Sequence, residues 1–428
     1  MRKSGFSLLS LVTGVCLFPA AAFAQTPPAP PAPAPAPAAP PAAEAPGVAP
    51  ATPATQPAAT NAPAPPPAAA PADVAAPPAP APPAEAVAAP TPTFPATTIT
   101  GFVEGAYHRM LGSAHIGQAV ATRAYDTSNG FLLHLAHLSV KHQLNENVYG
   151  VIEIDAGADA TYNHDPSGAQ RTLFDVQEAY GVATGSGFTF TAGKFATYEG
   201  IEVIEGPSDP TITRGFLYWL AEPVTHVGAK LHYTAGPADI GVGLVNGWDT
   251  NNGIFATGDN NNKKTFIWRA AVTPSPMFFA ALSGTVGSEQ PSDTNSRVSV
   301  DLTGAVVPTD FLTINFQGNL GSEKGVGTDP TKTSSWLGFG LQPVVKSGAM
   351  SLGGRLEYFK DKNGSRTLVT SGDPSLINLT ITPGYTIASA FTIRGELRYD
   401  HSSEPFLGQA SIGKKSQGTM ALSAHYVF

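Results

Sequence analysis

Thr419-Met420-Ala421-Leu422-Ser423-Ala424-His425-Tyr426-Val427-Phe428 ends the chain, and apolar side chains occupy every second position of it, from Met420 to Phe428. A strand of a closed membrane barrel has one row of side chains facing lipid and the other facing the lumen, with aromatic residues at the membrane interface. The stretch is therefore typical of the last strand of an outer-membrane β-barrel. A half-buried strand of a soluble protein alternates in the same way, so the rest of the chain has to decide.

The N-terminus has the layout of an export signal. Arg2 and Lys3 precede an apolar run over residues 6–18, and Ala22-Phe23-Ala24 matches a small-residue cleavage site. A bulky valine precedes Cys16, the only cysteine, which favours cleavage after the alanine motif over the alternative of a lipoprotein anchor. We expect residues 1–24 to be a signal peptide and the mature chain to contain no thiol.

Residues 25–96 form a segment rich in alanine and proline. It holds 26 of the 41 prolines of the chain, and its only charged residues are Glu44, Asp73 and Glu85. Such a composition cannot form a core and favours an extended, semi-rigid polyproline II spacer. We predict a disordered periplasmic linker, which is either an inert tether or an arm that spans the periplasm and contacts the cell wall.

The remaining sequence offers no transmembrane helix, because proline or charge interrupts every apolar run before eighteen residues. An exported chain of this kind can cross a membrane only as a closed barrel, which satisfies every backbone hydrogen-bonding group within itself. Beyond the linker, 24 − 2 = 22 basic residues face 32 − 3 = 29 acidic ones. This mildly acidic balance argues against a nucleic-acid partner.

From Thr97 onward the chain consists of sixteen segments with period-two alternation, each followed by turn residues. They are residues 97–107, 131–142, 147–157, 171–184, 187–194, 225–235, 237–246, 264–273, 276–287, 296–307, 310–320, 333–345, 349–359, 375–385, 390–400 and 417–428.

The alternation assigns the two faces of each segment. Leu397 and Tyr399 would meet lipid, whereas Arg394, Glu396 and Arg398 would line the lumen. A dry sandwich core could not bury that density of charge without a large energetic cost. The pattern therefore favours a barrel that is apolar outside and wet inside.

The links between segments alternate in length. Short ones follow the even-numbered segments, as at Gly236-Pro237 and Pro308-Thr309, and longer ones rich in Asn, Asp, Gly and Ser follow the odd-numbered segments. Outer-membrane barrels have short periplasmic turns and longer outside loops. We predict an all-β fold, a transmembrane antiparallel β-barrel of about 16 strands over residues 97–428, with both ends in the periplasm of a Gram-negative bacterium. A barrel of this size can hold a water-filled lumen.

The longest link, residues 195–224, is too apolar for a solvated loop. Its aliphatic and aromatic side chains need a surface to pack on, and the inner wall of the barrel supplies one; packing on outer loops or on a partner subunit is the alternative. Folding inward would narrow the lumen and place five charged residues near the permeation path: Glu199, Glu202, Glu205, Asp209 and Arg214.

Four short motifs resemble those of the OmpL-like β-barrel porins. They are Gly193-Lys194-Phe195 followed by Glu199, Thr213-Arg214-Gly215-Phe216, Pro223 with His226 and Gly228, and Asn246-Gly247-Trp248-Asp249. The resemblance covers about residues 97–428. It implies a porin, and the similar sixteen-stranded general porins imply a constriction loop between strands five and six and a homotrimer.

A pore selects by its width and by the charges at its narrowest zone. The predicted lumen faces carry both signs: Lys230, Arg269, Arg355, Arg394, Arg398, Glu153, Asp155, Asp175, Asp301, Glu357 and Glu396. Opposed charges would create a transverse field that orders polar solutes; alternatively, these are solvated wall residues without a selective role.

The sequence contains only weak signals for a catalytic or metal-binding site. His134 and His137, three positions apart on a strand, should face opposite sides, which disfavours a shared metal. Asp259-Asn260-Asn261-Asn262 could hold calcium through oxygen ligands, but the sequence favours a solvated loop over a calcium site there. We expect no catalytic residue, no cofactor and no resident metal.

Three functions remain to be compared. The first is a passive porin in outer-membrane lipid that admits small hydrophilic solutes. The second is a plugged structural or adhesive barrel whose linker is attached to the cell wall. The third is an outer-membrane hydrolase, which would need a serine paired with a histidine base.

Overall fold

The computed structural model describes residues 93–111, 129–164, 172–249, 261–291, 295–367, 372–405 and 414–428. The predicted signal peptide and nearly all of the predicted linker lie outside the described residues, as do Asp259 and Asn260 of the candidate calcium loop. Among the residues that are described, no helix is both long and apolar enough to cross a membrane.

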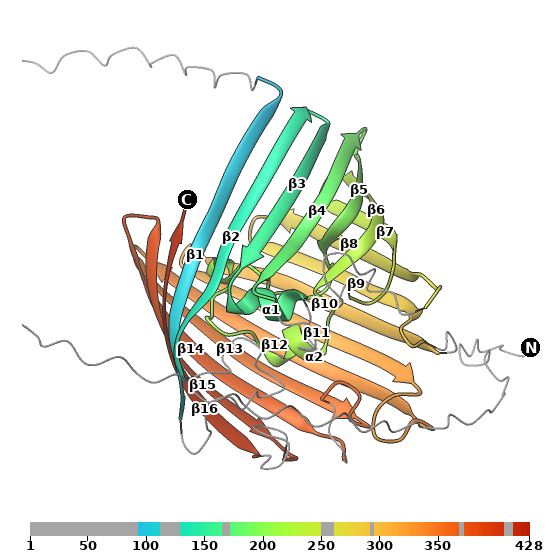
Figure 1. Ribbon diagram of the computed structural model, residues 1–428, viewed down its shortest axis with the longest axis vertical. Coiled ribbons are helices and arrows are strands. Elements are labelled where there is room, and N and C mark those ends of the chain that lie inside the picture. The colour runs from blue at the N-terminus through green and yellow to red at the C-terminus, as the bar shows by residue number, and fades with distance from the viewer. Residues whose placement is uncertain are drawn as a thin grey trace, which may run out of the picture. The chain divides into compact units, whose positions relative to one another are not determined.

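Sixteen antiparallel strands close into one barrel, in which each strand pairs with its neighbours in sequence and β1 pairs with β16 (Figure 1). The strands are β1 (Ala96–Leu111), β2 (Gly130–Asn145), β3 (Val148–Ala156), β4 (Phe174–Gly185), β5 (Phe188–Ala196), β6 (Thr225–Ala235), β7 (Ala238–Val245), β8 (Thr265–Ser275), β9 (Phe278–Ser288), β10 (Ser296–Thr309), β11 (Leu312–Lys324), β12 (Thr333–Ser347), β13 (Met350–Lys362), β14 (Ser375–Ile387), β15 (Phe391–Ser402) and β16 (Ser416–Val427). In the described parts of the links there are three short helices: α1 (Ala158–His164), η1 (Gly206–Ser208) and α2 (Phe216–Leu220). The predicted fold class and the sixteen predicted segments are confirmed.

Tight turns and long links alternate around the barrel. The even-numbered strands end in links of two or three residues, such as 146–147, 186–187 and 388–390. Ser186 and Gly187 both have positive φ, 50° and 82°, as the primed hairpin turns require because they match the strand twist. The short turns therefore form one rim, and the first and last strands also begin and end there.

The two faces of the strands are inverted relative to a soluble protein. On β15, Leu397 and Tyr399 are 57% and 49% exposed. Arg398, which lies between them, and Asp400, which follows Tyr399, are buried. Side chains alternate between faces along a strand, so the apolar row faces outward and the charged row faces inward. This arrangement is what a lipid environment requires.

One β-bulge changes the faces predicted for two histidines. Glu104 pairs with Leu135 and Gly105 with Leu133, so His134 is an extra residue in β2. The inserted residue shifts the alternation, and both His134 and His137 are buried inside the barrel. The expectation of opposite faces was wrong for this reason. Their partners still differ, since His134 contacts His108 at 2.5 Å and His137 contacts Asp155 at 2.8 Å. The described residues contain no group of three side chains that could hold a metal.

Candidate permeation site

The link between β5 and β6, residues 197–224, packs against the inner wall formed by β10 to β15. We call it the inner segment. Val203 is 40% exposed, but six other apolar side chains of the segment are almost fully buried: Ile204, Ile212, Phe216, Leu217, Tyr218 and Leu220. An apolar chain inside a wet barrel is stable only if its side chains leave water, which explains why this segment packs against the wall. It also reaches β4 through Glu205 and β1 through η1.

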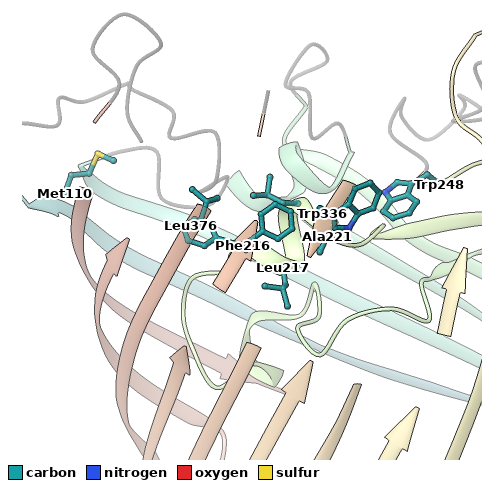
Figure 2. Packing of buried hydrophobic residues seen from close by; sticks show 9 residues of the cluster. Met110, Phe216, Leu217, Ala221, Trp248, Trp336 and Leu376 are labelled. Atoms are coloured by element: carbon teal, nitrogen blue, oxygen red, sulfur yellow. The ribbon is translucent and has the colours of Figure 1, made fainter. Parts of the chain in front are cut away.

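Helix α2 anchors the C-terminal part of the inner segment in a small core inside the lumen. Figure 2 shows Phe216, Leu217 and Ala221 in one row of side chains that runs from Met110 to Trp248 and includes Leu376 and Trp336. Glycine at position 338 of β12 leaves room for the helix, because a Cβ atom there would lie 3.1 Å from Leu217 Cγ.

Arg366 and two tryptophans close this core at its Trp248 end. The guanidinium of Arg366 lies 5.4 Å from the ring centroid of Trp248 and 5.3 Å from that of Trp336, and its Nε donates to Leu220 O at 2.5 Å. Asp249 accepts the N–H groups of Val224 and Thr225 at 3.2 Å each. The Asn-Gly-Trp-Asp motif therefore fixes the C-terminal end of the inner segment.

Three arginines of the wall hold the inner segment by its carboxylate, hydroxyl and carbonyl oxygens. Arg355 on β13 donates to Glu202 Oε1 at 2.7 Å and to Thr211 Oγ1 at 2.8 Å. Arg394 donates to Asp209 O at 2.9 Å, and Arg398 donates to Arg214 O at 2.5 Å. These guanidinium groups are buried, so they act on the segment and not on the water of the lumen.

Two wall glutamates accept backbone N–H groups of the same segment. Glu396 Oε2 accepts from Ile212 N at 2.6 Å, and Glu357 Oε2 accepts from Phe216 N at 2.7 Å at the start of α2. The first N–H groups of a helix have no partner within it. Glu357 therefore supplies the acceptor that the chain itself lacks.

Most of the predicted constriction residues form ion pairs or hydrogen bonds with other protein groups. Arg214 Nε pairs with Asp209 Oδ2 at 2.8 Å. In addition to its ion pair with Arg355, Glu202 accepts a hydrogen bond from Gly215 N at 2.6 Å. Glu205 accepts a hydrogen bond from Nε2 of Gln177 on β4. Most charged side chains of this segment therefore form contacts within the segment or with the barrel wall.

A cluster of carboxyl groups forms a different kind of attachment. Glu199 and Glu222 of the inner segment and Asp301 of β10 share Gln317 and Asn319, with Gln317 Nε2 at 2.6 Å from Glu222 Oε2 and 2.9 Å from Asp301 Oδ2. Among the described residues no basic side chain forms an ion pair with these three. Burial and the nearby charge of Asp301 raise the pKa of Glu199 to about 8 and the pKa of Glu222 well above its ordinary value. The raised pKa of Glu199 favours its protonated form at neutral pH.

The opposite side of the lumen is open. A cavity of about 550 Å³ lies along β3 to β8, and Glu178, Lys230, Asp239, Arg269, Tyr180 and Phe195 are among the residues that line it. Arg269 Nη1 contacts Asp239 Oδ1 at 2.7 Å, and both side chains are more than a fifth exposed. A second cavity, of about 400 Å³, lies towards the short turns beside Pro210, Asn315 and Arg394.

A family model with the description "Putative beta-barrel porin-2, OmpL-like" matches residues 96–428. The chain belongs to this porin family. The family inferred from the sequence motifs is therefore confirmed, and the porin is an outer-membrane channel protein of a Gram-negative bacterium. No curated protein matches its sequence.

Solved structures share the fold of this porin. The anion-selective porin from Comamonas acidovorans is 11% identical and covers 78% of this chain and 99% of its own, with a TM-score of 0.54. Outer-membrane expressed OmpT of Vibrio cholerae is 12% identical, with 78% and 97% covered and a TM-score of 0.52. OmpF of Salmonella typhi in complex with daunomycin is 12% identical, with 78% and 97% covered and a TM-score of 0.50. At these identities the likeness shows the fold alone.

The structure of the porin divides the predicted pore-wall residues into two groups. Those covered by the inner segment are Arg355, Arg394, Arg398, Asp301, Glu357 and Glu396. Those on the other side are Glu153, Asp155, Asp175, Lys230 and Arg269. Of these, Asp155 pairs with His137 and Asp175 with Lys194 at 3.4 Å, while Glu153 accepts Ser139 Oγ at 2.9 Å. Their roles in permeation stay predictions.

Sequence reasoning missed three acidic residues of the site. Glu104 on β1 pairs with Arg394 at 2.6 Å, Glu178 lines the open cavity, and Glu222 belongs to the carboxyl cluster. Glu104 and Glu178 lie within predicted strand segments, so the alternation of faces could have found them. Glu222 follows α2 in the inner segment, where no periodic pattern reports which side chains meet the wall.

Proposed function

We propose that this porin passes small hydrophilic solutes by passive diffusion along the part of the lumen that the inner segment leaves open, beside β3 to β8. The inner segment sets the width of this passage, and the charges that line the opposite wall set its selectivity. One observation carries the proposal: the charges of β13 and β15 are buried under the segment, whereas the cavity beside β4 to β8 keeps charged side chains in contact with its interior.

The plugged structural barrel is the weaker alternative. It would require protein to fill both sides of the lumen, and the cavity of about 550 Å³ beside β3 to β8 does not fit that requirement. The porin family and the barrel also favour a channel over an enzyme.

A planar-bilayer recording tests the function directly. Refolded protein should give stepwise currents of the size expected for a water-filled pore. Replacing residues 200–220 by a shorter Gly-Ser link should enlarge the current, because the obstacle on the β10–β15 side is removed. A silent bilayer over folded wild-type protein would contradict the channel, and an unchanged current in the loop variant would contradict the constriction.

The position of the N-terminal linker is proposed from the barrel rims. The first strand begins at the rim of short turns, and in outer-membrane barrels short turns face the periplasm. The linker would then enter the periplasm, within reach of the cell wall. Protease accessibility of the linker in intact cells tests this placement, since a linker outside the cell would be cleaved.

We also propose a homotrimer in outer-membrane lipid, on the strength of the resemblance to general porins. Light scattering of the detergent-solubilised protein measures the protein mass directly. A mass of one chain would exclude the trimer without touching the channel proposal.

A further inference from the structure

Two opposite charges in the open cavity take no part in an ion pair within the described part of the chain. Glu178 on β4 and Lys230 on β6 line the cavity together. The other charges there are occupied, because Asp239 accepts from Arg269 at 2.7 Å and contacts His232 Nδ1 at 3.0 Å. Of the remaining two, Lys230 is half-buried and Glu178 is 9% exposed, and both border the cavity.

Lys230 is held in place by aromatic rings and not by a carboxylate. Its Nζ lies 4.2 Å from the ring centroid of Phe195 and 4.8 Å from that of Tyr198. A cation over ring faces is oriented but keeps its charge exposed to other partners. The ammonium therefore remains able to meet an anionic group inside the cavity.

Glu178 lies beside a second acidic residue of the barrel wall. It is directly opposite Glu153 in the pairing of β3 and β4, and like charges opposite each other destabilise a sheet. Its carboxylate accepts the backbone N–H of Ala196. Glu178 thus places a second acidic group in the part of the wall that lines the cavity.

The two charges lie on either side of the point where β5 gives way to the inner segment. Glu178 contacts the backbone of Ala196, and Lys230 lies over the ring of the preceding Phe195. Thr191 and Thr197 complete the polar lining. A solute that squeezes past the inner segment therefore meets a negative and a positive group within one cavity.

We propose that Glu178 and Lys230 give this porin a preference for small zwitterionic solutes, with the ammonium of the solute facing Glu178 and its carboxylate facing Lys230. A simple cation is attracted by Glu178 but repelled by Lys230. A simple anion is attracted by Lys230 but repelled by Glu178. Only a solute that carries both charges gains at both. The inference rests on the proposed channel function and names its solute class.

Proteoliposome uptake of alanine and lactamide tests the pair, because the two solutes have nearly the same size and only alanine is zwitterionic. The readout is the ratio of their uptake rates after subtraction of protein-free liposomes. One contact between unit charges about 4 Å apart in water is worth about fivefold. Lys230→Glu and Glu178→Lys each replace such an attraction by a repulsion, so each should lower the ratio about 25-fold. The double exchange Glu178→Lys with Lys230→Glu should restore it.

Matched variants separate selectivity from folding. Lys332, 70% exposed and paired with Asp329, lies in a link outside the cavity, so Lys332→Glu should leave the ratio unchanged. Lys230→Gln and Glu178→Gln remove one charge with little change in size and should lower the ratio less than the reversals, even if a reversal variant fails to refold.

The outcomes distinguish the two levels of the proposal. If lactamide does not enter liposomes that contain folded wild-type protein, the channel itself is wrong. If lactamide enters but the ratio is the same in wild type, single variants and the double exchange, the zwitterion preference is wrong and the channel stands. A double exchange that stays as low as the single reversals also overturns the preference.

Discussion

The two sides of the lumen carry the same residue types but use them differently. On the β10–β15 side, Arg355 and Glu357 are buried and bind the inner segment. On the β3–β8 side, Arg269 and Lys230 line a cavity. The strand pattern is the same on both sides, so position on an inward face does not decide what a charge does. The role of a charged side chain depends on whether the inner segment covers it, because covering excludes the water that would otherwise compete for hydrogen bonds to the charge.

The largest effect is expected from breaking the covered side at Arg355. Arg355→Met would leave Glu202 buried without its cation, and removal of one partner of a buried pair costs about 3–5 kcal/mol. We expect a lower unfolding midpoint in urea and a larger, noisier pore current. An Arg355→Met variant with wild-type stability and current would mean that this side does not hold the segment.

A somewhat smaller effect is expected from the apolar core of α2. Leu217 is 1% exposed, and Leu217→Ala removes buried methyl groups at a cost of about 2–5 kcal/mol. The variant should loosen the inner segment and raise the frequency of current fluctuations in single-channel recordings. Leu397→Ala, on the lipid face, is the control and should leave the fluctuations unchanged.

The carboxyl cluster makes the docking of the inner segment sensitive to alkali. The pKa of Glu199 is raised from 4.5 to about 8 in the docked segment. The docked state binds this proton more tightly, so the stabilisation is fully present below about pH 4.5 and is lost as the pH rises through about 8. Wild-type currents should therefore become noisier between pH 6 and pH 9.

Glu199→Gln provides the control for that titration. The amide keeps the size of the side chain and cannot lose a proton, so the variant should show steady currents across the same pH interval. If wild type and variant respond alike to alkali, another group causes the response and the cluster does not.

The smallest effect is expected on the open side. Arg269 and Asp239 are 22% and 23% exposed, and a pair in contact with water contributes about 1 kcal/mol or less. Arg269→Gln should leave the urea midpoint nearly unchanged while shifting the reversal potential in a salt gradient towards cations. A large loss of stability would erase the contrast between the two sides.

Much of the barrel was readable from local pattern. The alternation in residues 390–400 correctly separated Leu397 and Tyr399 from Arg394 and Arg398, and the short links matched the turns. The bulge at His134 was not readable, because an extra residue in one strand is defined by the pairing of the other strand. The candidate site was predicted as a set of charges, but not with its partition into covered and open groups.

The sequence alone determined the number of strands, the faces of side chains in regularly alternating strands and the position of the long apolar link, since period-two alternation and turn composition are local properties of a chain. The tertiary structure alone decided which charges the link covers. Arg355 meets Glu202 across 153 positions of sequence, and Ile212 meets Glu396 across 184. Contacts at such separations depend on how the closed barrel brings distant strands around one segment, and no local pattern encodes that arrangement.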